Sequence, residues 1–338
     1  MEENYRKIKK VNQSTLKKIL VSPQAYIRAR DKVDEEGVTP EHFVFGRMVD
    51  DMLLNPSEID NLYYVMDDVG TSNAIKEIIR NVYDFAKLEN NITLIVDPKL
   101  EDAILNACEM YNYQPRYKPE TKISKIQELG GIYFNSLNNA GKKTIVSKED
   151  YNSATICVAA LKTDKYISKY FSKAKEVENL DRFIVEFELK GIPCKGELDR
   201  IHINHSEKII RPIDFKYTGK SVLGFKFDFW KYRYDFQGAF YTMGILRNDK
   251  IKALVLEGYK LLPFQYIVVE KDMNNLPMIF EFTDSIISMG QLGGTFPNGK
   301  VIEGISQALE KYVYHNKTNN WDYSKEYIDS GGKVMLTL

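Results

Sequence analysis

Apolar residues near the N-terminus recur at helical spacing in two segments. In the first, Ser14 is the candidate N-cap, and Ser22-Pro23 opens a further helical turn. The second runs from Thr39-Pro40-Glu41 to Leu54, and Asn55-Pro56 is the stop signal that follows it. The pattern therefore predicts an N-terminal part made of helices.

Helical spacing continues in the middle of the chain. Residues 73–111 are predicted to be mostly helical, with one apolar side formed by Ile75, Ile78, Ile79 and Val82. Residues 114–125 are polar and contain two prolines, which favours an exposed connection. Helical spacing resumes after Ser147.

The pattern changes to alternation at Arg182, where every second residue is apolar as far as Leu189. The turn signal Gly191-Ile192-Pro193 follows and indicates a β-hairpin. Further strands are predicted at 195–203, 208–217, 253–262 and 266–269, and helices at 229–246, near Asp284 and at 302–314. The chain as a whole is predicted to be α/β.

Composition excludes several classes of protein. With 338 residues, of which 43% are apolar, the chain can bury a large core, which argues against disorder, collagen and coiled coil. Lys and Arg (47) balance Asp and Glu (47), so nucleic-acid binding would have to use a local basic patch. The three cysteines lack the Cys-x-x-Cys spacing of zinc or iron-sulfur sites and are expected to be buried thiols. No segment resembles a signal peptide or a membrane span, so an intracellular protein is expected.

One strand combines a buried face with a charged one. In Ile213-Asp214-Phe215-Lys216, the period of two places Asp214 and Lys216 on one face and the apolar residues on the other. The spacing of acid and lysine occurs elsewhere in the chain, so alone it is weak. The context distinguishes Asp214 and Lys216 from the other matches, because Asp199 ends the preceding strand and a hairpin would bring Asp199 beside Asp214. Two close carboxylates beside a lysine favour a hard divalent cation such as Mg²⁺ or Mn²⁺.

Residues downstream of this strand extend the candidate site. Gln237 and Tyr241 are four apart on an aromatic-rich helix and therefore share a face. Basic residues outnumber acidic ones between Arg200 and Lys260, and Lys226, Lys231 and Arg233 are the candidates for contact with DNA phosphates. No Gly-rich phosphate loop of the Walker kind is present, so ATP dependence is not expected.

The order of these motifs resembles the PD-(D/E)xK nuclease superfamily. The likeness is to its exodeoxyribonuclease VIII (RecE-like) branch, which is related to lambda exonuclease and the RecB nuclease domain. It rests on eight segments, which cover most of the chain outside about 70–145: 14–17, 22–26, 45–56, 195–200, 213–217, 234–241, 268–271 and 320–323. Each segment is short, but their order and spacing together are fairly specific.

The resemblance implies a restriction-endonuclease-like α/β core with a mixed central sheet flanked by helices, plus a mainly helical insertion. It implies a single nuclease domain over 1–338. Within it, 1–69 would be the N-terminal helical part of the core, 70–145 the insertion, and 146–338 the sheet-containing catalytic core.

The resemblance also implies roles for single residues. Asp199 and Asp214 would be metal ligands, with the carbonyl of Phe215 as a third. Lys216 would orient or deprotonate the attacking water, and Gln237 and Tyr241 would support the site or touch DNA. Glu186 is a candidate additional acid, equally interpretable as an exposed strand residue. Ser14 is either a residue near a bound phosphate or, more simply, an N-cap.

Asp50 departs from the pattern, since the family has a histidine after Phe-Gly-x-x-x. Phe43, Gly46 and Asp50 share one helix face, so Asp50 is predicted to point inward and Asp51, about 100° round the helix, to solvent. An inward Asp50 would be a further oxygen ligand for Mg²⁺ or Mn²⁺. The other interpretation is an exposed helical acid.

The implied activity is metal-dependent hydrolysis of linear double-stranded DNA, 5′ to 3′, in phage-type recombination or DNA repair. The implied assembly is a ring-shaped homo-oligomer in the cytoplasm that hands single strands to an annealing protein. Two alternatives remain open: an endonuclease or defence nuclease of the same superfamily, and a non-catalytic DNA-binding recombination scaffold.

Overall fold

The computed structural model describes residues 5, 7–31, 41–66, 71–88 and 92–334. The helix start predicted at Thr39-Pro40 lies outside these residues. The chain divides into two compact units, the first made of 1–46 and 157–338 and the second of 47–156. Each unit is described by itself.

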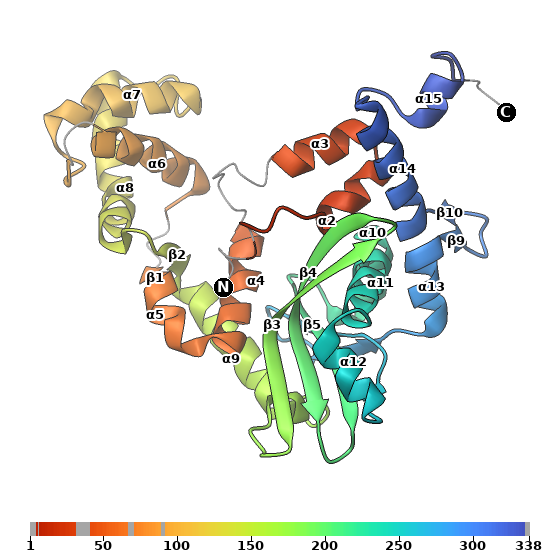
Figure 1. Ribbon diagram of the computed structural model, residues 1–338. Helices are drawn as coiled ribbons and strands as arrows, with labels where there is room; N and C mark the ends of the chain where they lie inside the picture. Colours follow the sequence, from red (N-terminus) through yellow and green to blue (C-terminus); the bar gives the residue numbers. More distant parts are fainter. Residues whose placement is uncertain (1–4, 6, 32–40, 67–70, 89–91, 335–338) are drawn as a thin grey trace. The chain divides into compact units, whose positions relative to one another are not determined.

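The first unit is built on a mixed six-stranded sheet in the order β3-β4-β5-β7-β8, with the short β6 paired to β5. The strands are β3 (Val177–Leu189), β4 (Ile192–Asn204), β5 (Ile209–Thr218), β6 (Lys260–Leu261), β7 (Gln265–Glu270) and β8 (Met278–Glu281). β3, β4 and β5 are antiparallel neighbours and appear side by side in Figure 1. β7 is parallel to β5 and antiparallel to β8.

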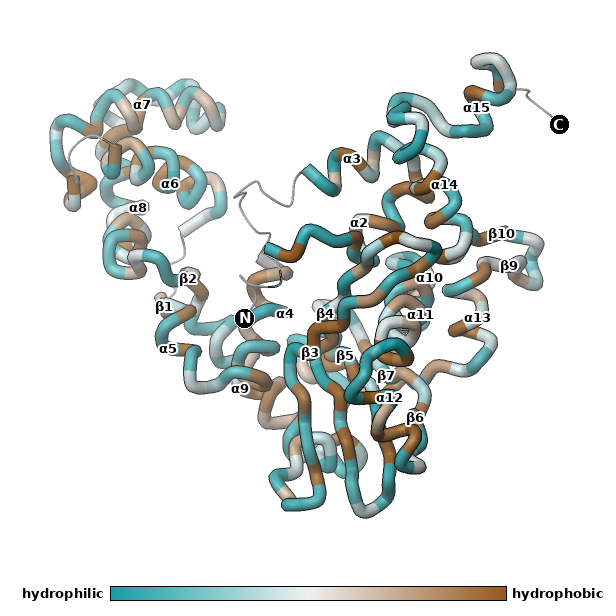
Figure 2. The backbone as a smooth tube through the Cα atoms, viewed as in Figure 1, coloured by the Kyte–Doolittle hydropathy of each residue, from teal (hydrophilic) through white to brown (hydrophobic). Residues whose placement is uncertain are grey.

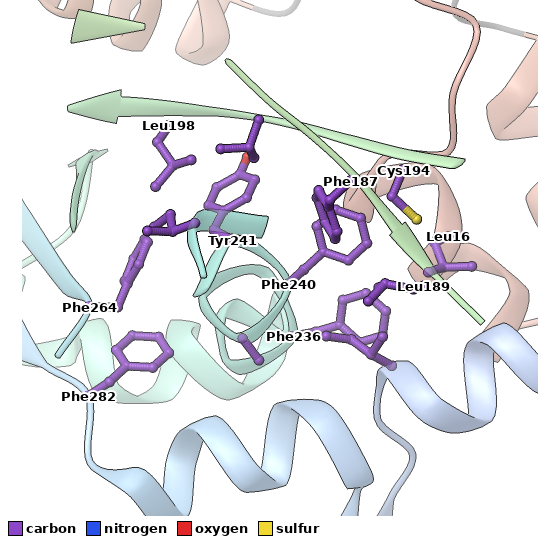
Figure 3. Packing of buried hydrophobic residues seen from close by; sticks show 14 of the residues in the cluster. Leu16, Phe187, Leu189, Cys194, Leu198, Phe236, Phe240, Tyr241, Phe264 and Phe282 are labelled. Carbon is purple, nitrogen blue, oxygen red and sulfur yellow. The ribbon is translucent and has the colours of Figure 1, made fainter. Parts of the chain in front are cut away.

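One face of the sheet packs on α10 (Phe225–Lys231) and α11 (Tyr234–Ile245). Figure 3 shows Phe240 of α11 among apolar side chains that include Phe187 from β3 and Leu198 from β4. Glycine permits this close approach, because a Cβ on Gly244 would lie 2.7 Å from the ring of Phe187. The main apolar core therefore lies between the sheet and α11.

The opposite face of the sheet is covered as well. Phe171, in the 3₁₀ helix η5 (Ser168–Phe171), stacks on Phe215 of β5 at 5.7 Å between ring centroids. Cys157 of α9 (Lys148–Thr163) donates its thiol to the carbonyl of Glu270 at 3.5 Å. Because both faces are covered, every residue of β7 is buried.

The remaining elements of the first unit are helices and short strands. They are α2 (Gln13–Leu16), η1 (Lys17–Leu20), α3 (Pro23–Asp31), η6 (Val222–Gly224), α12 (Asp249–Leu256), α13 (Asp284–Leu292), β9 (Gly294–Thr295), β10 (Val301–Ile302), α14 (Ile305–Thr318) and α15 (Lys325–Asp329). The predicted α/β class, with a mixed central sheet flanked by helices, is confirmed.

The second unit is mainly helical. Its elements are the greater part of α4 (Glu41–Leu54), then η3 (Pro56–Glu58), α5 (Ile59–Leu62), β1 (Tyr63–Met66), α6 (Asn73–Leu88), η4 (Pro98–Leu100), α7 (Glu101–Met110), α8 (Pro119–Ala140), β2 (Thr144–Ser147) and the start of α9. The predicted apolar side of α6 is confirmed, since all four of its residues are buried in a separate core.

Several local predictions are wrong. Residues 119–125 belong to α8 rather than to an exposed connection, because Pro119 occupies the first turn of a helix, where a proline costs nothing. The strand predicted from Ala253 is helix α12 as far as Leu256. The helix predicted over 229–246 is two helices, which Arg233 separates with a left-handed backbone (φ 57°).

Two further sequence inferences concern the hairpin and the thiols. The hairpin turn lies at Lys190 and Gly191, both with positive φ, rather than at 191–193, so Ile192 and Pro193 are already in β4. All three cysteines are free and buried, as predicted.

Figure 2 shows hydrophobic and hydrophilic residues interleaved along the strands of the sheet. None of the helices in the described ranges is long and apolar enough to cross a membrane.

Candidate metal and catalytic site

Strand β5 presents the acid and the lysine on the face that packs on α11. Ile213 and Phe215 are buried on the opposite face, as the alternation predicts. Asp214 is only 2% exposed, and Lys216 forms an ion pair with its carboxylate. The strand thus holds a charged pair in a largely buried place.

Strand register brings Asp199 beside this pair. The last paired residues of β4 and β5 are Arg200 and Ile213, so the next position in the same register is Asp199 opposite Asp214. At this position the Asp199 side chain, rather than a backbone carbonyl of β4, is the acceptor: its Oδ2 accepts the backbone N–H of Phe215 at 2.6 Å. This hydrogen bond places Asp199 beside Phe215, the residue that follows Asp214 on β5, as the predicted hairpin requires.

Strand β4 changes the face that it presents at this point. Leu198 and Ile201 are three residues apart yet belong to the same apolar cluster, which a regular period of two does not allow. On β3, Arg182 has a left-handed backbone (φ 49°), and it interrupts the ladder opposite Asp199. Such irregular pairing re-aims side chains and is common beside active sites.

Arg200 fixes the strand next to Asp199 from the other face. Its guanidinium binds both carboxylate oxygens of Asp181 on β3, at 2.5 and 2.9 Å, and the carbonyl of Tyr170 at 2.6 Å. A bidentate contact of this kind is both strong and directional. We infer that it holds β4 in place where Asp199 departs from the regular ladder.

The amide of Gln237 on α11 connects the carboxylate to two tyrosines. Its Nε2 donates to Asp214 Oδ1 at 3.2 Å and to the hydroxyl of Tyr241 at 3.4 Å. Its Oε1 accepts from the hydroxyl of Tyr266 at 3.2 Å, which orients the amide. Gln237 and Tyr241 are both buried. Gln237 contacts Asp214 directly, and Tyr241 acts through its contact with Gln237.

Tyr266 is a site residue that the sequence reasoning missed. It lies on β7 directly beside Asp214, and its ring centroid is 5.3 Å from the Lys216 ammonium. The ring centroid of Tyr234 lies 5.5 Å from the same ammonium. The signal available in the sequence was only an aromatic residue in a predicted buried strand, which usually indicates core packing.

Charge in this buried place is balanced within the site. Burial disfavours the charged form of Lys216, but Asp214 and Asp199 outweigh it and raise the pKa of the lysine well above its usual value. Burial also raises the pKa of Asp214, and Lys216 opposes that rise. A carboxylate held this deeply needs a positive charge nearby.

The donor set fits a hard divalent cation. Asp214 Oδ2 is buried, and apart from its ion pair with Lys216 it receives no hydrogen bond within the described part of the chain. The two aspartates and the Phe215 carbonyl supply only oxygen, which suits Mg²⁺ or Mn²⁺. The described residues contain no group of three or more His, Cys, Asp and Glu side chains that could hold a metal. The proposed ligand set contains only two such side chains, Asp199 and Asp214, together with a backbone carbonyl.

The other predicted residues lie away from this cluster or are already engaged. Glu186 is exposed and pairs with Lys10 at 2.6 Å. Ser14 is exposed and donates to Asn12 Oδ1 at 2.8 Å, and Asn12 rather than Ser14 is the N-cap of α2. Arg233 binds both oxygens of the buried Asp235 and the carbonyl of Glu303. Lys226 and Lys231 are exposed on α10.

The orientation predicted for Asp50 and Asp51 is wrong. Asp51 is the buried acid, 5% exposed, and it accepts a hydrogen bond from the Tyr63 hydroxyl at 2.7 Å. Asp50 is half-buried, and Phe43, expected on the same inward face, is 60% exposed. Asp50 belongs to the second unit, whereas Asp199 and Asp214 belong to the first, so its role as a ligand stays a prediction.

Comparison with known proteins gives one family. Residues 12–292 match the family described as "PDDEXK-like domain of unknown function (DUF3799)". A solved structure from Eubacterium rectale named "Putative exonuclease" aligns with 90% of this chain and 96% of that chain, at 15% identity and a TM-score of 0.35. No curated protein matches the chain.

Proposed function

Because the chain belongs to this PDDEXK-like family, we propose that it is a metal-dependent nuclease that hydrolyses phosphodiester bonds in DNA. The observation that supports this most is the cluster on β4 and β5, where Asp214 pairs with Lys216 and Asp199 accepts the backbone N–H of the adjacent Phe215. Gln237, which donates to Asp214, completes the arrangement. Burying a carboxylate costs free energy unless a cation or hydrogen bonds offset it, and such buried acids are concentrated at functional sites.

Each residue has a distinct role in the proposed reaction. Asp199, Asp214 and the carbonyl of Phe215 would hold the cation, which we propose to be Mg²⁺, with Mn²⁺ as a substitute. When bound, it would supply positive charge that polarises the phosphate and lowers the pKa of water. Lys216, kept charged by its neighbours, would orient the attacking water and stabilise negative charge on the phosphate. Gln237, Tyr241 and Tyr266 would hold Asp214 in place.

We further propose that the substrate is the end of linear double-stranded DNA and that the enzyme acts as a RecE-like exonuclease in the 5′ to 3′ direction. This rests on the motif resemblance and on the order of Asp199, Asp214, Lys216, Gln237 and Tyr241 along the chain. A homo-oligomeric ring and a single-strand annealing partner, in recombination or repair, belong to the same proposal.

Linear duplex DNA labelled at its ends should be degraded in the presence of Mg²⁺, while a covalently closed circle of the same sequence should persist. An exonuclease needs an end at which to start, and label release from one end reports the polarity. EDTA should stop the reaction, since the site would lose its cation. Cleavage of the circle at a similar rate would indicate an endonuclease, and binding without cleavage would indicate a non-catalytic scaffold.

DNA binding should weaken steeply as salt increases, and replacing Lys226 and Lys231 by Glu should flatten that dependence. Both lysines are exposed on α10, and each phosphate that a lysine neutralises releases about 0.9 counterions. The measurement is the slope of log affinity against log salt concentration. As a matched control, Lys250→Glu and Lys252→Glu alter exposed lysines of α12 that already pair with acids. If the two double variants had equal salt slopes, DNA would not contact Lys226 and Lys231.

A further inference from the structure

Lys17, at the start of η1, is half-buried, and within the part of the chain that the structure describes its ammonium has a single hydrogen-bond acceptor. Its Nζ donates to the carbonyl of Tyr232 at 2.9 Å. Within the described ranges, no carboxylate forms an ion pair with it, in contrast to Lys216 and Arg233. An ammonium has three donors, so two of them remain for another partner.

The charges around Lys17 are mostly positive. Burial, Lys18, Lys216 and Arg233 lower the pKa of Lys17 to about 8, and Asp235 only partly opposes them. Lys216 and Arg233 have their own carboxylates, Asp214 and Asp235. Among the described residues Lys17 thus has no carboxylate of its own, and its charge acts on Lys216 of the candidate catalytic site.

We propose that Lys17 binds a phosphate of the DNA strand, beside the bond that is hydrolysed. A phosphate oxygen would accept the free donors of the ammonium and supply the missing negative charge. The position fits, because the Tyr232 that Lys17 contacts has its ring 5.9 Å from Tyr234, and Tyr234 lies 5.5 Å from the Lys216 ammonium. The inference rests on the proposed nuclease function and adds a substrate contact to it.

A purely structural role for Lys17 makes a different prediction. Tyr232 is the C-cap of α10, and a lysine donor can satisfy a carbonyl at a helix end. A neutral donor could serve that purpose equally well, whereas phosphate binding requires the charge. Lys17→Gln and Lys17→Arg both keep a nitrogen donor and differ in charge, so the pair separates the two roles.

The test measures binding of a short blunt duplex in EDTA, which prevents cleavage, across a range of salt concentrations. Lys17→Gln should bind about tenfold more weakly than the parent, with a salt slope smaller by about 0.9, the value for one lost phosphate contact. Lys17→Arg should restore both. Lys18→Gln is the matched control, because Lys18 is adjacent and exposed, and it should leave both nearly unchanged.

Thermal unfolding of each variant identifies any that fail to fold, and Lys17→Met then provides a second uncharged variant. Equal salt slopes for Lys17→Gln and Lys17→Arg would overturn the proposal and leave Lys17 as a helix cap. Failure of the parent protein to bind or cleave DNA would instead contradict the nuclease function. The two failures are therefore distinguishable.

Discussion

Lys216→Ala and Asp214→Asn should each reduce DNA hydrolysis on the order of 100-fold or more, while DNA binding and folding persist. Lys216 forms an ion pair with Asp214, whose carboxylate is only 2% exposed. Both side chains lie on the face of β5 opposite Ile213 and Phe215, so the apolar packing of the strand is kept. The Asn variant also keeps an oxygen for Gln237.

Single-turnover cleavage at matched metal concentration measures this effect. The chain offers a matched control in Glu188, which has the same acid, any residue, lysine spacing with Lys190 but is exposed on β3. Glu188→Gln should retain parental activity. If the Lys216 and Asp214 variants kept activity within a fewfold of the parent, the assignment of the site would be wrong.

Gly290→Ala should destabilise the fold by about 2 kcal/mol, within the usual range for overpacking a core. Gly290 lies on α13 where this helix crosses α11, and a Cβ would come within 2.3 Å of the backbone oxygen of Asp235. A backbone atom cannot move aside as a flexible side chain can, so the two helices would have to separate. Because α11 also carries Gln237, hydrolysis should fall as well.

The free energy of unfolding in urea measures the change. Gly224→Ala is the control, since no atom lies within 4 Å of its added Cβ and its φ is −82°. Alanine there should alter stability by less than about 1 kcal/mol. A similar small change at Gly290 would show that the helices tolerate the extra methyl group.

Local patterns were sufficient for the strands that carry the acids. Alternation in β5 predicts that Asp214 and Lys216 share a face, because successive side chains of a strand point to opposite sides. The short turn between β4 and β5 then determines their register, and Asp199 comes close enough to β5 to accept the backbone N–H of Phe215. These features depend on neighbours in sequence, so they could be predicted.

Other local patterns permitted two structures. The apolar run at 253–256 is compatible with a strand or a helix, and the cap at Asn248, which accepts the backbone N–H of Ile251, starts helix α12. For Asp50 and Asp51, helical spacing alone could not decide which acid is inside. Tyr63 decides it, since its hydroxyl donates to Asp51 and thereby satisfies the buried carboxylate.

By itself, the sequence determined the α/β class, the strands around the acids and the pairing of Asp214 with Lys216 on one face. Only the tertiary structure decided which distant side chains complete the cluster. Tyr266 from β7 orients Gln237 from α11, and the Lys17 ammonium reaches the carbonyl of Tyr232, 215 residues away along the chain. The physical reason is that strand and helix periods are set by nearby backbone geometry, whereas buried hydrogen bonds and charges find partners only once the segments have packed together.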